Sequence, residues 1–247
     1  MRIRVFDTPD AAAAYAVALV EQTAAVYAEP VLGLATGGTM IPFYKALVQA
    51  VRQGLDLSRA WAINLDEYVG LGAEHPQSCA GFMREHLYRH VPWDGARAHI
   101  PDGCAPDLAA ECRRYDRLLA THPVHLQFLG IGLNGHIGFN EPGDELVAET
   151  HLVELSETTI RSNARFFRDP GEVPRRAITM GVGGILRAER VVLLAFGEQK
   201  AEVVARALTG PITTRLPASL LQLHRDVTVL LDTAAAQKIR GKTVENG

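Results

Sequence analysis

The sequence has little charge imbalance, few cysteines and no long hydrophobic run. Its 25 Lys and Arg residues nearly balance its 28 Asp and Glu residues, which gives a formal net charge of −3. So mild a charge provides neither the basic surface of a nucleic-acid-binding protein nor a polybasic patch for membranes. The three cysteines, Cys79, Cys104 and Cys112, form no C-x-x-C pair, so reduced thiols in a cytoplasmic protein are the simplest interpretation.

The longest apolar stretch, AAAAYAVALV at residues 11–20, is bounded by Asp10 and Glu21. It is too short to span a bilayer and favours an alanine-rich helix. The first residues, MRIRVFDTPD, alternate apolar and polar side chains as a strand does, unlike a secretory signal. We therefore expect a soluble cytoplasmic protein with no membrane partner.

Short apolar runs alternate with amphipathic segments along most of the chain. This alternation predicts an α/β fold with a mostly parallel sheet flanked by helices. With 247 residues and no internal repeat, low-complexity tract or obvious linker, residues 1–247 are predicted to form a single domain. Strands are expected at 2–6, 31–35, 60–65, 124–132, 151–155, 177–181, 191–197 and 227–231, and helices at 9–28, 41–51, 77–90 and 106–120.

Four unusual clusters each follow a predicted strand. They are TGGT at 36–39, Asp66 with Glu67, LGIGLNGHIGFNEPG at 129–143, and GEQK at 197–200. The carboxyl ends of parallel strands share one edge of a sheet, and open α/β folds bind ligands outside that edge. The sequence therefore predicts that these distant clusters meet at one site.

The stretch Thr36-Gly37-Gly38-Thr39 stands between a predicted strand and a predicted helix. Glycines let backbone N–H groups approach an anion, threonines add hydroxyls, and a helix N-terminus adds partial positive charge. The stretch is not a Walker A loop, because no G-K-[ST] follows it. Phosphate binding is one interpretation, and a tight strand-to-helix turn is the other.

Two adjacent carboxylates, Asp66 and Glu67, follow the predicted strand at 60–65. Neighbouring side chains on an extended backbone point in opposite directions, so only one of them needs to enter a site. Desolvation raises the pKa of a carboxyl at a strand end toward the range of a general base. The alternative is a helix cap or a surface turn.

The glycines of LGIGLNGHIGFNEPG spell G-x-G-x-x-G, the pattern of a dinucleotide-binding loop. That loop needs a helix directly after its glycines, and Gly138, Pro142 and Gly143 oppose one here. We interpret the stretch instead as a loop that closes around a ligand and presents His136 for proton exchange, with Glu141 or Asn134 orienting the ring. A buried structural histidine is the alternative.

Arg161, Arg165 and Lys200 are candidate partners for an anionic ligand, because a phosphate group forms charge-assisted hydrogen bonds with such cations. His86 and His90 are spaced i, i+4, but H-E-x-x-H is absent and no third ligand is evident. We therefore predict no metal site.

Seven motifs together resemble the glucosamine-6-phosphate deaminases. In order along residues 30–231 they are LGLATGGT, NLDEYVGL, GIGLNGHIGFNEPG, SNARFF, GVGGIL, GEQKA and PASLLQLH. The resemblance implies a modified Rossmann-like α/β sheet, no metal or other cofactor, and conversion of glucosamine 6-phosphate and water to fructose 6-phosphate and ammonia. The family includes hexamers and smaller assemblies, so a homo-oligomer is compatible with the resemblance.

The resemblance also implies a role for each matching residue. Asp66 would move the proton between C2 and C1, His136 would open the sugar ring, and Glu141 would support His136. Asn134 replaces the aspartate of many relatives, so electrostatic support for a protonated His136 would come mainly from Glu141. The implied catalytic set is Asp66, Asn134, His136 and Glu141, and the implied substrate-binding set is Thr36, Gly37, Gly38, Thr39, Arg165 and Lys200.

Three other functions remain to be weighed at the level of sequence. A galactosamine-6-phosphate deaminase would differ only in the orientation of one substrate hydroxyl. A 6-phosphogluconolactonase shares the fold and phosphate loop but typically continues G-H as T-A-S-L-F-P-G, where this chain has HIGFNEPG. A non-catalytic sugar-phosphate sensor would tolerate loss of Asp66 and His136, which are both present.

Overall fold

The computed structural model describes residues 1–164, 167, 169–239 and 244–246. Within them, eight strands form one sheet in the order β11-β1-β10-β9-β6-β2-β3-β5, and every pairing in it is parallel. These strands are β1 (Arg2–Phe6), β2 (Val31–Leu34), β3 (Trp61–Asn64), β5 (Ala98–His99), β6 (Leu126–Leu129), β9 (Arg190–Ala195), β10 (Val227–Asp232) and β11 (Val244–Asn246).

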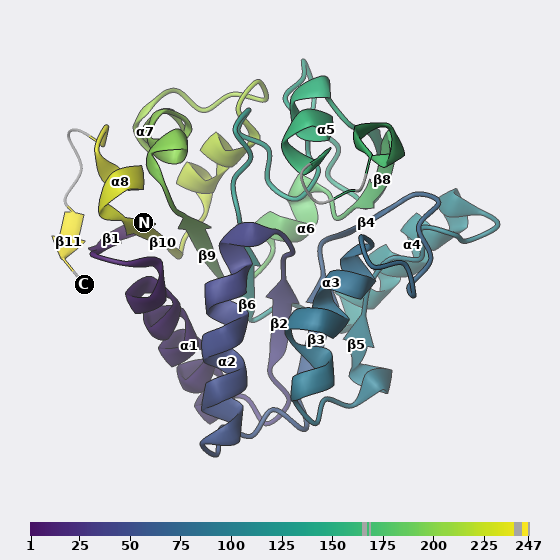
Figure 1. Ribbon diagram of the computed structural model, residues 1–247, viewed down its shortest axis with the longest axis horizontal. Helices are drawn as coiled ribbons and strands as arrows, with labels where there is room; N and C mark the ends of the chain where they lie inside the picture. Colours follow the sequence, from purple (N-terminus) through teal and green to yellow (C-terminus); the bar gives the residue numbers. More distant parts are fainter. Residues whose placement is uncertain (165–166, 168, 240–243, 247) are drawn as a thin grey trace.

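Helices cover both faces of this sheet. In Figure 1, α1, α2 and α3 lie side by side in front of it and α4 lies behind. The helices are α1 (Pro9–Val26), α2 (Ile41–Arg52), α3 (Cys79–His86), α4 (Leu108–Thr121), α5 (Glu157–Asn163), α6 (Val182–Leu186), α7 (Ala201–Thr209) and α8 (Thr233–Ala236). The short 3₁₀ turns are η1 (Gly38–Met40), η2 (Tyr88–His90), η3 (Gly95–Arg97), η5 (Pro170–Glu172), η6 (Glu198–Lys200) and η7 (Pro217–Leu223).

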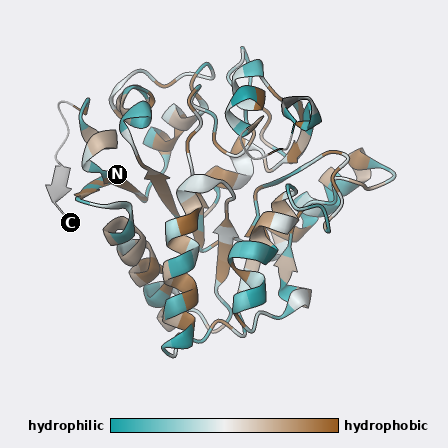
Figure 2. Ribbon diagram, viewed as in Figure 1, coloured by the Kyte–Doolittle hydropathy of each residue, from teal (hydrophilic) through white to brown (hydrophobic). Residues whose placement is uncertain are grey.

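The central strands are apolar along their whole length because helices cover them on both sides. All four residues of β2 are buried, as are five of the six in β9 and in β10. A strand covered on both faces needs a continuous apolar run rather than an alternating one. Figure 2 shows these strands in brown at the centre, with teal residues on the outer surfaces of the helices. The mostly parallel sheet flanked by helices is thus confirmed.

A second, smaller sheet was not predicted. Its strands are β4 (Asp66–Tyr68), β8 (Arg176–Thr179) and β7 (His151–Glu154), in the order β4-β8-β7, and both pairings are antiparallel. The strands expected at 151–155 and 177–181 therefore exist but lie outside the parallel sheet. The apolar pattern of a short strand does not indicate which sheet the strand joins. The sequence analysis therefore did not distinguish the strands of the small sheet from those of the parallel sheet.

Most predicted helix boundaries lie within two residues of the observed ones. The exception is the helix expected at 77–90, which ends at His86 and gives way to a 3₁₀ turn. Leu87 interrupts it with φ of −134° and ψ of −66°, outside the helical region. That residues 1–247 form a single domain stays a prediction.

Two further features of the described residues bear on the sequence analysis. None of the helices they form is both long enough and apolar enough to cross a bilayer. The three cysteines are free thiols, with Cys79 and Cys112 buried and Cys104 exposed.

Candidate active site

A pocket of about 370 Å³ lies above four neighbouring strands, β9, β6, β2 and β3. The arrows of β2 and β9 in Figure 1 both point toward this end of the sheet. Each of the four clusters that follow these strands lines the pocket. The lining includes Thr36, Gly37, Gly38, Thr39, Asp66, Gly130, Gly132, His136 and Lys200.

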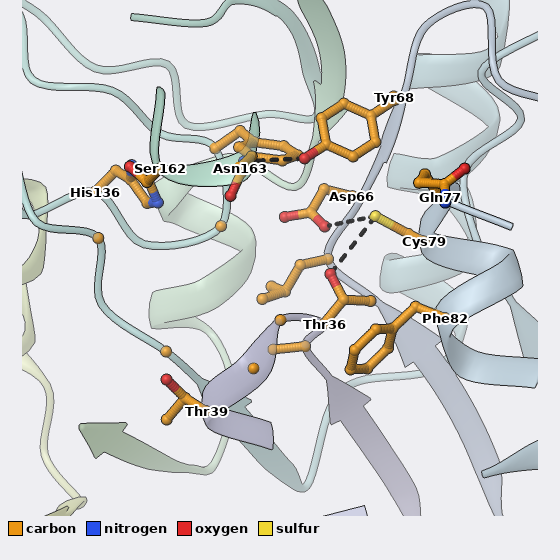
Figure 3. Close-up of a pocket in the computed structure, with 18 of the residues that line it drawn as sticks. Thr36, Thr39, Asp66, Tyr68, Gln77, Cys79, Phe82, His136, Ser162 and Asn163 are labelled. Carbon is orange, nitrogen blue, oxygen red and sulfur yellow. Dashed lines mark hydrogen bonds between the residues drawn. The ribbon is translucent and has the colours of Figure 1, made fainter. Parts of the chain in front are cut away.

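Asp66 lies at the start of β4, and a single residue, Leu65, separates it from the end of β3 at Asn64. The Cys79 thiol donates to Asp66 Oδ1 over 3.6 Å, and Cys79 Sγ also lies 3.6 Å from Thr36 Oγ1 (Figure 3). A Cβ on Gly138 would lie 3.5 Å from Asp66 Oδ2, so this second oxygen faces the glycine-rich loop. The carboxyl is therefore held by one oxygen and presents the other to the pocket.

The surroundings of Asp66 favour the protonated form of its carboxyl. Burial raises the pKa of Asp66 to about 7, the thiol of Cys79 partly opposes that rise, and the charge of Glu67 adds to it. Only 6% of the residue is exposed. A carboxyl with a pKa near neutrality can both accept and return a proton.

Glu67 turns away from the pocket, as the alternation along a strand requires. Its carboxylate accepts backbone N–H groups from Tyr68, Cys79 and Ala80 over 2.8–2.9 Å. Burial raises the pKa of Glu67, and these three N–H groups oppose the rise. Glu67 thus caps the first turn of α3 and fixes the position of Cys79 beside Asp66.

His136 stands on a loop that continues without a helix from Gly130 to Thr150. A Cβ at Gly132 would lie 2.4–2.6 Å from three atoms of the His136 ring, so only glycine leaves room for the imidazole. Gly135 has a φ of +91°, and a Cβ there would lie 2.1 Å from Leu216 Cδ1. The glycines thus let the loop pack closely on itself, and the geometry of a dinucleotide-binding loop is absent from this described stretch.

Glu141 and Asn134 lie behind His136, away from the pocket. Asn134 Nδ2 donates to Glu141 Oε2 over 2.6 Å, while Asn134 Oδ1 accepts the backbone N–H of His136 over 3.2 Å. His136 Nδ1 lies 3.7 Å from Glu141 Oε2. Burial works to raise the pKa of Glu141, but His136, the Thr159 hydroxyl and the Ser156 N–H outweigh it and lower that pKa to about 2.

The remaining predicted site residues that the structure describes lie in the two segments that lead into α2 and α7. Gly37 has a φ of +100°, and η1 follows it directly into α2. Lys200 ends η6 and donates from Nζ to the carbonyl of Ile131 over 2.6 Å. Arg165 lies outside the described residues, whereas Arg161 is exposed on α5.

Within the part of the chain that the structure describes, no group of three His, Cys, Asp or Glu side chains is arranged to hold a metal ion. His86 packs on Phe82, with 4.4 Å between the ring centroids. His90 Nε2 lies 2.9 Å from the carbonyl of Glu85. The two histidines therefore make separate contacts with their own helix and its extension.

Comparison with known proteins identifies the family. The sequence profile of the glucosamine-6-phosphate isomerases and 6-phosphogluconolactonases matches residues 7–230. The chain belongs to this family. It is 49% identical over 214 residues to a glucosamine-6-phosphate deaminase of Clostridium perfringens, covering 86% of this chain and 88% of that one. It is 50% identical over 209 residues to a glucosamine-6-phosphate deaminase of Leuconostoc citreum, covering 85% and 88%.

Solved structures of family members have the same fold. A monomeric glucosamine-6-phosphate deaminase superposes with a TM-score of 0.93 at 41% identity, covering 96% of this chain and all of that one. A 6-phosphogluconolactonase of Leishmania guyanensis superposes with a TM-score of 0.75 at 20% identity, covering 97% and 99%, which is evidence for the fold alone.

The sequence analysis did not identify several residues that line the pocket or contact Asp66, His136 and Glu141. Cys79 looked like an ordinary thiol, although its sulfur contacts Asp66. Thr159 belongs to none of the clusters that the sequence analysis examined, although it contacts both His136 and Glu141. Phe82 and Tyr68 also line the pocket. No local pattern marks these residues, because each contact joins segments far apart in the sequence.

The buried carboxyl of Asp66 predicts a stability change with pH. The unfolded chain ionises Asp66 near 3.8 and the folded chain near 7, so the folded state loses stability as pH rises between these values. Asp66→Asn removes this loss. The free energy of unfolding of the variant, relative to the unaltered protein, is expected to rise by on the order of 3 kcal/mol between pH 5 and pH 8.

Urea denaturation at pH 5, 6, 7 and 8 measures this difference. Asp7→Asn, at an exposed position after β1, is the matched control and should show no comparable trend. A difference between Asp66→Asn and the unaltered protein that stays constant over this range would show that Asp66 is not held protonated by burial.

Proposed function

We propose that this chain converts glucosamine 6-phosphate and water to fructose 6-phosphate and ammonia. The observation that carries the proposal is that a buried carboxyl, Asp66, and an imidazole, His136, line one pocket together with the TGGT loop and Lys200. Relatives that are 49–50% identical over more than four fifths of the chain are glucosamine-6-phosphate deaminases, which supports the same reaction here.

The first step is opening of the pyranose ring. His136 delivers a proton to the ring oxygen as the bond from C1 to that oxygen breaks, and the C1 hydroxyl gives up its own proton to solvent, so that the open-chain aldehyde forms. An imidazole suits this task because it exchanges protons near neutrality. Glu141, ionised behind the ring, stabilises the positive charge that the imidazole carries before it gives up its proton.

The second step moves a proton from C2 to C1. Asp66 removes the C2 proton as a carboxylate, which forms an enolamine, and returns a proton to C1, which forms a ketimine. Water then adds to the ketimine and ammonia leaves, giving fructose 6-phosphate. A pKa of about 7 suits both halves of this transfer, since the group must be ionised to accept and protonated to donate.

The phosphate group would bind at the two loops that enter α2 and α7. Backbone N–H groups of Gly37, Gly38 and Thr39 point from the start of a helical segment, where partial positive charge accumulates. Lys200 adds a full charge from the facing loop, and Arg165 is assigned the same role by its motif. Holding the phosphate fixes C1 and C2 relative to Asp66, which contributes through positioning.

The test is a parallel assay of three compounds in the presence of EDTA: glucosamine 6-phosphate, galactosamine 6-phosphate and 6-phosphogluconolactone. We expect equal release of fructose 6-phosphate and ammonia from the glucosamine ester, with no loss of rate in EDTA. Consumption of the galactosamine ester or the lactone alone would replace the proposal with the corresponding enzyme. Sugar-phosphate binding without turnover of any of the three would support a sensor instead.

A further inference from the structure

Thr159 lies between the imidazole of His136 and the carboxylate of Glu141. It lies on α5 and is 1% exposed. Its Oγ1 is 2.5 Å from Glu141 Oε1 and 3.2 Å from His136 Nδ1. The direct separation of His136 Nδ1 and Glu141 Oε2 is 3.7 Å, too long for a hydrogen bond. The hydroxyl of Thr159 is therefore the bridge between them.

The direction of each hydrogen bond in this bridge follows from counting protons. Glu141 is ionised, because its pKa is lowered to about 2, so both its oxygens only accept. Two oxygens 2.5 Å apart need a proton between them, and the only one available is the single hydroxyl proton of Thr159. Thr159 therefore donates to Glu141 and can only accept from its other neighbours.

The hydrogen bonds of the neighbouring side chains Ser156 and Asn134 agree with this assignment of donor and acceptor. Ser156 Oγ accepts the backbone N–H of Thr159 and the amide Nδ2 of Asn134, so its own proton goes to Thr159 Oγ1 over 3.1 Å. The Asn134 amide gives its other proton to Glu141 Oε2. Thr159 Oγ1 then has one remaining lone pair, which faces His136 Nδ1. His136 must supply the proton for that contact.

We propose that Thr159 is a positioning residue that keeps the proton of neutral His136 on Nδ1, so that Nε2 is the nitrogen that exchanges a proton with the substrate. Glu141 and Thr159 both lie outside the pocket lining, while the His136 ring belongs to it. The hydrogen bond with Thr159 therefore occupies Nδ1 of His136 and leaves Nε2 for the pocket. This inference rests on the proposed function and adds to it which atom of His136 acts.

The first experiment compares Thr159→Val, which keeps the shape and removes the hydroxyl, with Thr159→Ser, which keeps the hydroxyl. Thr158→Val is the matched control on the same helix, because the hydrogen bond between Thr158 and the Ser162 hydroxyl uses the backbone carbonyl of Thr158 and not its side chain. For Thr159→Val we expect kcat to fall by about 10- to 30-fold with KM changed by less than about twofold. Thr159→Ser should recover most of the loss, and Thr158→Val should behave as the unaltered protein.

A kinetic isotope effect separates this role from a general structural one. With glucosamine 6-phosphate deuterated at C2, slower ring opening in Thr159→Val should bring the isotope effect on kcat toward unity, since C2–H cleavage then limits the rate less. A fall in kcat with an unchanged or larger isotope effect and no recovery in Thr159→Ser would overturn the proposal. So would full activity of Thr159→Val.

The tautomer itself can be read without turnover. ¹⁵N NMR of histidine-labelled protein, at a pH where the ring is neutral, should show a protonated Nδ1 and an unprotonated Nε2 for His136, with the signal assigned by its loss in His136→Gln. Thr159→Val should shift this pattern toward the other tautomer. A proton on Nε2 in the unaltered protein would refute the inference even if the deaminase assay succeeds, and the expected pattern would support it even if that assay fails.

Discussion

Asp66→Asn is expected to lower kcat for glucosamine 6-phosphate by about 10³- to 10⁴-fold, because an amide cannot take the C2 proton. The substitution keeps the size and shape of a side chain that is almost fully buried. It leaves the TGGT loop and Lys200 in place. Binding of the unreacted sugar phosphate should therefore persist, with the dissociation constant within about tenfold of the KM of the unaltered protein.

Two measurements check this prediction together. Ammonia release at saturating substrate gives kcat, and isothermal titration of glucosamine 6-phosphate into the variant gives the dissociation constant. Asp7→Asn is the control for the same chemical change at an exposed position. Turnover of Asp66→Asn near that of the unaltered protein would show that another group moves the C2 proton.

Gly132→Ala is expected to lower kcat by about 10²-fold or more, because displacement of a catalytic group by an ångström can cost that much. The added Cβ would lie 2.4 Å from His136 Cε1 and 2.6 Å from both ring nitrogens. No real Cβ approaches other atoms so closely, and the ring is the part able to move. The new methyl group would therefore push the imidazole out of its place in the pocket.

The control for this substitution is Gly95→Ala, where a Cβ would have no atom within 4 Å. It should leave kcat and KM unchanged. A crystal structure of Gly132→Ala should show the His136 ring displaced from Thr159. Full activity with the ring unmoved would mean that the backbone of the loop shifts instead and that the close fit of Gly132 to the ring is not required.

The sequence predicted that the four clusters that follow strands would lie close together. TGGT, Asp66, the His136 loop and Lys200 each follow a buried apolar run, and the structure brings all four to one pocket. The reason is simple: a parallel sheet places the carboxyl ends of neighbouring strands on one edge, and β9, β6, β2 and β3 are neighbours. Arg165, also expected there, lies outside the described residues.

The structure adds two details to the sequence analysis. The glycines around His136 were interpreted as letting the loop close around a ligand; Gly132 lines the pocket, and Gly132 and Gly135 also leave room for the side chains of His136 and Leu216. The two candidate orienting groups were Glu141 and Asn134. In the structure Asn134 contacts Glu141 and the His136 backbone, whereas the ring nitrogen meets Thr159.

By itself the sequence determined the alternation of strands and helices, the family and the kinds of chemical group available for proton transfer. These depend on local periodicity and on short contiguous motifs. Only the tertiary structure decided that Cys79 holds one oxygen of Asp66, that Glu67 caps α3, and that Thr159 bridges His136 and Glu141. Each of these contacts joins residues 12 to 23 positions apart or on different elements, and hydrogen bonds act over about 3 Å of space rather than along the chain.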